Sequence, residues 1–88
     1  MKIKENFVLR ELCGTYVVVA VGEQTLNFKG LVKLNETGAF LWQKMAEADI
    51  TEEALLQAML SEYDVEKEVA KTDIEEFINL LKEADLLA

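Results

Sequence analysis

The spacing of apolar residues changes at one point of the chain, between Gly30 and Trp42. The segment that ends at residue 34 is short and rich in β-branched and apolar residues, as in a strand. From residue 36 the apolar positions recur every three to four residues, as in a helix. Asn35 lies at the change, where its side chain can cap a helix, and Glu36 follows at the end that favours negative charge. We therefore predict a strand over 29–34 that runs directly into a helix over 36–46.

Two earlier segments, 7–13 and 15–21, are rich in β-branched and aromatic residues and are separated by Gly14 alone. This arrangement predicts a β-hairpin. The third strand is short enough to lie at the edge of a sheet. Lys29 and Lys33 on that strand are typical of edge positions, where charge deters aggregation.

The rest of the chain predicts two further helices, one that begins at a Thr51 cap and one over 66–84. We expect Trp42 on the first helix to pack in the core. We also expect Gly38 to allow close packing of that helix on the sheet. The apolar positions of the second helix are Leu55, Leu56, Met59, Leu60 and Tyr63, and those of the third are Val69, Ala70, Ile74, Phe77, Ile78, Leu81 and Ala84.

A second row on the third helix, Asp73, Phe77, Leu80 and Ala84, makes its apolar face wider than one contact with a small core requires. Either the helix is wrapped by its own domain, or the extra width is one wall of a groove. The predicted fold class is α+β and winged-helix-like, with a three-stranded antiparallel sheet followed by three helices. With 88 residues, we expect one domain over 1–88.

Charge is divided unevenly along the chain, which has a net charge of −8. Residues 1–33 have five basic and three acidic side chains, whereas residues 34–88 have four basic and fourteen acidic ones. The first two predicted helices have one lysine, Lys44, among many carboxylates. Since nucleic-acid binding depends on cationic side chains, this distribution argues against it.

Residues for catalysis or metal binding are scarce, because the chain has no histidine and a single cysteine. It also lacks the glycine-rich phosphate-binding motifs. We expect no enzyme activity, no cofactor and no metal site. Cys13 is expected to be a small buried strand residue in a reducing compartment, and the absence of a long apolar run predicts a soluble cytoplasmic protein without membrane contact.

Three segments carry a resemblance to a known family: residues 28–42, the sequence Glu-Tyr-Asp-Val at 62–65, and residues 73–81 with the Leu-Leu pair at 86–87. Together they resemble the PqqD family. The resemblance implies a peptide chaperone that binds the leader segment of a ribosomally made precursor peptide. It also implies that the chaperone presents this leader to a modifying enzyme, often a radical S-adenosylmethionine protein. Some members act in the assembly of pyrroloquinoline quinone.

Carried onto this chain, the resemblance implies that the leader adds a strand beside the third strand and rests against the third helix. We expect apolar anchors at alternate leader positions and a Lys or Arg of the leader toward the helix. The predicted peptide-binding residues are Lys29, Gly30, Leu31, Val32, Lys33 and Leu34 on the strand, and Asp73, Glu76, Phe77, Leu80 and Leu81 on the helix.

The sequence leaves two alternatives open. One is a structural subunit that docks on a larger enzyme, and the other is a degenerate winged-helix nucleic-acid binder. An edge strand could also pair with a second copy of the chain, so a homodimer would compete with peptide binding.

Overall fold

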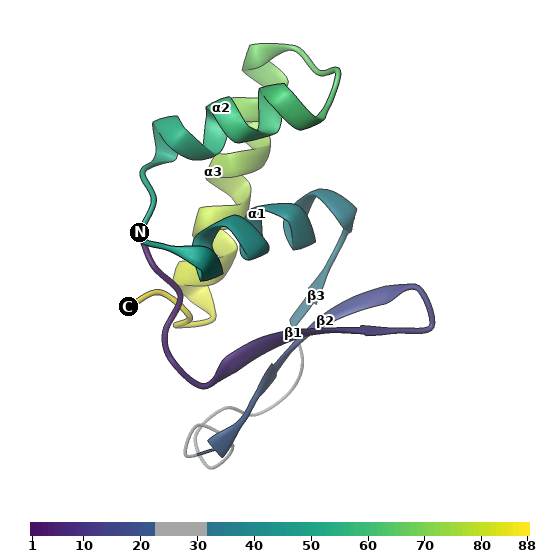
Figure 1. Cartoon of the computed structure of the whole chain (residues 1–88), viewed down its shortest axis with the longest axis vertical. Coiled ribbons are helices and arrows are strands. Elements are labelled where there is room, and N and C mark those ends of the chain that lie inside the picture. Colours follow the sequence, from purple (N-terminus) through teal and green to yellow (C-terminus); the bar gives the residue numbers. More distant parts are fainter. Residues whose placement is uncertain (23–31) are drawn as a thin grey trace.

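Three strands precede three helices in the computed structural model, which describes residues 1–22 and 32–88 (Figure 1). The strands are β1 (Phe7–Leu12), β2 (Thr15–Ala20) and β3 (Val32–Leu34), and the helices are α1 (Glu36–Glu47), α2 (Glu52–Glu62) and α3 (Lys67–Glu83). This order confirms the predicted α+β class. The predicted positions Lys29, Gly30 and Leu31 lie outside the described residues.

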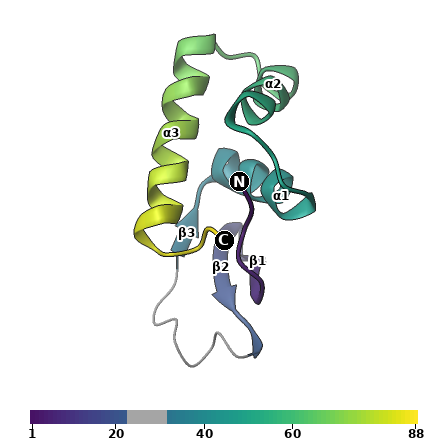
Figure 2. The ribbon, with the colours of Figure 1, turned by 90° about the vertical axis from the view of Figure 1, so that its left-hand side faces the viewer.

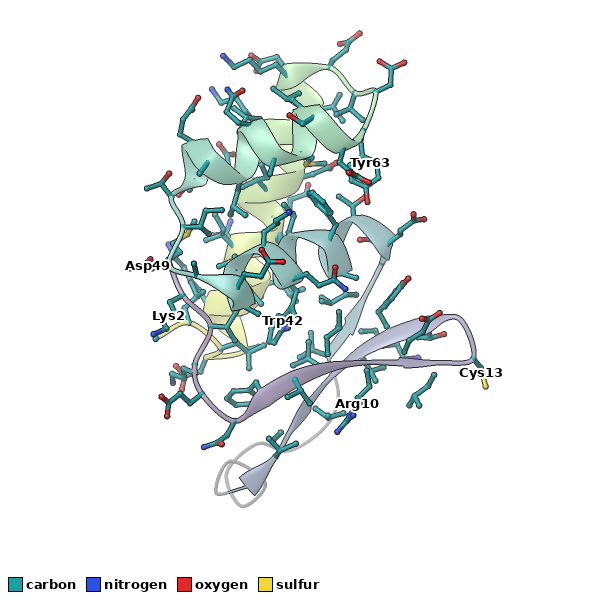
Figure 3. All side chains as sticks on the ribbon, viewed as in Figure 1. Lys2, Arg10, Cys13, Trp42, Asp49 and Tyr63 are labelled. Atoms are coloured by element: carbon teal, nitrogen blue, oxygen red, sulfur yellow. The ribbon has the colours of Figure 1, made fainter. Side chains whose placement is uncertain are left out.

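The sheet has the order β1-β2-β3 with antiparallel neighbours, so β3 lies at one edge of it. The hairpin turn between β1 and β2 consists of Cys13 and Gly14, whose φ angles are 52° and 80°. Two positive φ values match the twist of a tight hairpin. The expectation for Cys13 was wrong: it is an exposed turn residue at the tip of the hairpin, and β1 ends one residue before it (Figure 3).

The core forms where the helices cover one face of the sheet (Figure 1). Register places Leu9, Val18 and Val32 side by side across the three strands, and all three pack in or against the core. Trp42 is 2% exposed, which confirms its predicted place in the core. Leu41, Met45, Leu55, Met59 and Leu81 are at most 1% exposed and belong to the same core.

The two predicted helix caps are present. The Asn35 side chain accepts a hydrogen bond from the Gly38 amide at 2.7 Å, and Thr51 Oγ1 accepts one from the Ala54 amide at 3.1 Å. These bonds satisfy amides that the first turn of a helix leaves without a partner. The Asn35 cap explains how α1 can begin after a single residue that follows β3.

Helix α3 buries Ala70, Ile74 and Ile78, which are among its predicted apolar positions, whereas Val69, another of these positions, is 49% exposed. The helix ends in a chain reversal at Asp85, with φ 58°. The Leu86 amide donates to the Leu81 carbonyl at 2.9 Å, and the Asp85 amide donates to the Lys82 carbonyl at 3.1 Å. These two bonds define a Schellman motif, in which glycine commonly occupies the position of Asp85.

The two ends of the chain lie side by side (Figures 1 and 2). The Lys4 amide donates to the Leu86 carbonyl and the Ala88 amide donates to the Lys2 carbonyl, each at 2.9 Å. The terminal ammonium of Met1 contacts Asp49 Oδ1 at 2.7 Å. The N-terminal segment therefore links the α1–α2 connection to the segment that follows α3.

An aromatic contact joins α1 to the end of α2. The Phe40 and Tyr63 rings meet edge to face with centroids 5.4 Å apart, and Lys44 Nζ lies 5.5 Å from the Phe40 centroid. Partial burial raises the pKa of Tyr63, and the Glu36 carboxylate raises it further.

Candidate functional site

A groove of about 230 Å³ lies between the end of β3, the first turn of α1 and the side of α3. Figure 2 shows β3 and α3 next to each other, with α1 starting directly above β3. The groove is lined by Lys33, Leu34, Asn35, Thr37, Gly38, Leu41, Asp73, Glu76, Phe77 and Leu80. Three elements that are distant in sequence thus meet at one concave surface.

Local sequence explains how each wall is held. On the strand side, Leu34 is 7% exposed and anchors β3 in the core, while Lys33 points away from the core by strand alternation and is exposed. On the helix side, Phe77 is 6% exposed and Leu80 is 37% exposed. Phe77 therefore supports the floor of the groove, and Leu80 offers apolar surface to an incoming molecule.

The first turn of α1 closes the groove at one end. A Cβ atom added at Gly38 would lie 3.2 Å from Asn35 Oδ1 and 3.3 Å from Leu34 Cβ. Glycine is therefore the residue that lets α1 start so close to β3. This tight junction was predicted from the sequence, and it sets the position of the helix relative to the sheet edge.

The charges of the groove are carried by Lys33 on the strand wall and by Asp73 and Glu76 on the helix wall. Asp73 is half-buried and Glu76 is exposed. The ion pairs found within residues 1–22 and 32–88 involve Met1 with Asp49 and Lys4 with Asp85. The two carboxylates of the helix wall are thus available to a positively charged group of a ligand.

Six of the residues predicted for peptide binding line this groove together: Lys33, Leu34, Asp73, Glu76, Phe77 and Leu80. Leu81 does not, because it is completely buried in the core. Val32 is half-buried and packs against the core without lining the groove.

Sequence reasoning missed Asn35, Thr37, Gly38 and Leu41 as lining residues. The available signal was their place at the start of a helix that directly follows the edge strand. Because this helix begins directly after the edge strand, its first turn must lie beside any binding surface that the strand edge forms.

The lining of the groove combines apolar side chains with charged ones. Within the described ranges, no group of three or more His, Cys, Asp or Glu side chains is arranged to hold a metal ion. No described helix is both long enough and apolar enough to cross a membrane. The described part of the groove thus offers a short strand edge, exposed apolar surface and charged side chains.

Comparison with known proteins identifies the family. A profile of Coenzyme PQQ synthesis protein D (PqqD) matches residues 15–87, which is most of the chain. The chain belongs to the PqqD family. A search of curated proteins found no significant match.

Two solved structures have the same fold as this PqqD family member. One is described as TbiB1 in complex with the TbiA(beta) leader peptide; it has a TM-score of 0.77 and 23% identity, and the match covers 99% of this chain and 94% of that one. The other is a lasso peptide synthetase B1 complexed with the leader peptide, with a TM-score of 0.73, 22% identity, and coverage of 99% and 95%. At this level of identity the likeness shows the fold alone.

Proposed function

We propose that this chain is a non-catalytic recognition module, which binds the leader segment of a ribosomally made precursor peptide and presents it to a modifying enzyme. The observation that carries the proposal is the groove between β3 and α3 in a member of the PqqD family. Both proteins of similar fold are described in complex with a leader peptide, which supports the same class of ligand here.

The proposed binding mode is β-augmentation, in which the leader adds a strand to the sheet beside β3. An edge strand has backbone donors and acceptors on its outer side, and these can pair with an extended peptide. Alternate side chains of such a peptide would face α3, where Phe77 and Leu80 provide apolar contacts. The proposed strand-side residues are 29–34, of which the structure describes Val32–Leu34.

The proposed partners follow from the same role. A modifying enzyme, for which radical S-adenosylmethionine proteins are the first class to test, would receive the bound peptide. The interaction would take place in the cytoplasm, where ribosomal precursors are made. A second copy of the chain pairing through the edge of β3 would compete with the leader, so added peptide should shift any dimer toward monomer.

The nucleic-acid alternative is weaker on electrostatic grounds. Lys44, the lysine of α1, lies over the Phe40 ring and is half-buried. The surrounding helices add carboxylates, including two in the first turn of α2, Glu52 and Glu53. Such a surface would repel a phosphate backbone.

The direct test is an NMR titration of ¹⁵N-labelled protein with leader peptides encoded by small reading frames next to its gene. We expect amide shifts at Val32–Leu34 and along α3 from Asp73 to Leu80. Shifts confined to α2, or no shifts with any neighbouring leader, would overturn the proposal.

Two exposed apolar residues of α3 provide a matched pair of variants. Leu80 is 37% exposed inside the groove, and Val69 is 49% exposed outside it. Leu80→Asp should weaken leader binding about tenfold or more, because the leader would lose its apolar contact with the exposed part of Leu80 and would have to cover a carboxylate instead. Val69→Asp introduces the same charge on the same helix and should leave the affinity nearly unchanged. Equal losses in both variants would argue against the groove.

A further inference from the structure

The helix wall of the groove has different chemistry at its two ends. Asp73 and Glu76 come first along α3, and Phe77 and Leu80 follow one turn later. From Glu76 to Leu80 the helix rises about 6 Å, since each residue adds about 1.5 Å. In an extended peptide, two residues span about 6.6 Å, and side chains two apart face the same side. One peptide side chain can therefore face Glu76 while the side chain two positions away faces Leu80.

The relative direction of α3 and β3 determines which part of the helix wall lies near each end of the strand. In both views, α3 runs from α2 down toward the sheet, whereas β3 runs up from the sheet into α1 (Figures 1 and 2). The two elements thus run in opposite directions along the groove. The acidic part of α3 lies toward the α1 end of the groove, and the apolar part lies toward the start of β3.

The sheet is antiparallel throughout its described strands, and antiparallel pairing is slightly more stable per residue than parallel pairing. A peptide that pairs antiparallel with β3 therefore runs in the same direction as α3. It passes the carboxylates before it reaches Leu80.

We propose that the groove selects extended segments in which a Lys or Arg precedes a large apolar residue by two positions. This inference rests on the proposed function and adds the order and spacing of the side chains that are recognised. The cation would face Glu76, with Asp73 reinforcing the field, and the apolar side chain would cover Leu80. Lys33 on the strand wall would disfavour a second cation on the opposite side of the peptide.

Three synthetic peptides test the motif directly. Each is a nine-residue Thr/Val host, acetylated and amidated, with Lys-Thr-Leu, Gln-Thr-Leu or the reversed Leu-Thr-Lys at its centre. Titration of ¹⁵N-labelled protein gives both the affinity and the location of binding. We expect Lys-Thr-Leu to bind about two- to fivefold more tightly than either other peptide at low salt, the range of one solvent-exposed ion pair. Equal affinities for the three peptides would overturn the motif.

Glu76→Gln should abolish the preference for Lys over Gln in the peptide. Glu75→Gln is the matched control, because Glu75 is the adjacent residue on the α2 side of α3 and lies outside the groove. It removes the same charge and should retain the preference. A preference that survives Glu76→Gln, or that Glu75→Gln removes equally, would overturn the proposed contact.

The outcomes separate this inference from the proposed function. Shifts at Val32–Leu34 without any preference among the three peptides would overturn the motif and leave leader binding standing. Absence of shifts with all three peptides would likewise overturn the motif, while the titration with leader peptides decides whether the groove binds a leader at all.

Discussion

At the scale of single residues, several sharp reversals of the chain place a residue other than glycine at a positive φ angle. Among the described positions, Asn6, Cys13 and Asp85 have positive φ angles of 69°, 52° and 58°. This region is costly for residues with a Cβ atom, by about 1–2 kcal/mol, although Asn and Asp tolerate it better than others. Asp85 gains a compensating contact, since its carboxylate lies 2.9 Å from Lys4 Nζ.

Substitution of Asp85 isolates the backbone cost. Asp85→Gly and Asp85→Ala both remove the ion pair with Lys4, so they differ mainly in how easily they adopt φ 58°. We expect the Gly variant to have a free energy of unfolding about 1 kcal/mol higher than the Ala variant. Urea denaturation at neutral pH measures the difference. An Ala variant as stable as the Gly variant would show that this reversal is not strained.

At the scale of elements, the junction of β3 and α1 sets the geometry of the groove. The strand ends at Leu34, the cap is Asn35, and Gly38 fits between their side chains. Neither neighbour can move cheaply. Leu34 Cβ is fixed by the backbone of the strand, and Asn35 Oδ1 already accepts the Gly38 amide at 2.7 Å.

Gly38→Ala tests this junction. Alanine favours a helix over glycine by about 1 kcal/mol, but overpacking costs about 1–3 kcal/mol. We expect a net loss of about 1 kcal/mol in the free energy of unfolding, measured by denaturant titration. In the Asn35→Ala background the loss should shrink, because the nearest clashing atom is gone. A stabilised Gly38→Ala variant would mean that the strand edge gives way.

Local pattern predicted the elements better than it predicted which side chains reach the groove. Asn35 and Thr51 could be assigned as caps because capping depends on residues three positions apart. Helical periodicity cannot say which neighbour covers a given position. Leu81 and Leu80 are adjacent in sequence, yet the first is completely buried and the second lines the groove.

At the scale of the whole molecule, the two chain ends hold the sheet and the helices together. Residues 2–4 pair with residues 86–88, and Ile3 and Leu87 form a β-bridge. This pairing joins segments more than eighty positions apart, so no local sequence signal could have predicted it. The two ends lie near the start of β1 and the end of α3, and α3 is the helix that forms one wall of the groove (Figure 2).

The anchored N-terminus should make stability depend on pH through Asp49. A hydrogen bond from the terminal ammonium of Met1, and then its charge, hold the pKa of Asp49 below the ordinary value of 3.8. The carboxylate of the unfolded chain therefore takes up a proton at higher pH than that of the folded chain. Its contribution to stability is complete at neutral pH and is lost as the pH falls below about 4 through the pKa of the folded state.

Asp49→Asn removes this contribution at every pH. We expect the wild type to unfold at a higher temperature than Asp49→Asn at pH 7, and this gap in unfolding temperature to shrink as the pH falls below about 4. Acetylation of the terminal amino group should close the gap at pH 7 as well, since it removes the ammonium charge. A gap of constant size from pH 7 to pH 2.5 would contradict the assigned ion pair and indicate that the Asn side chain is disfavoured for another reason.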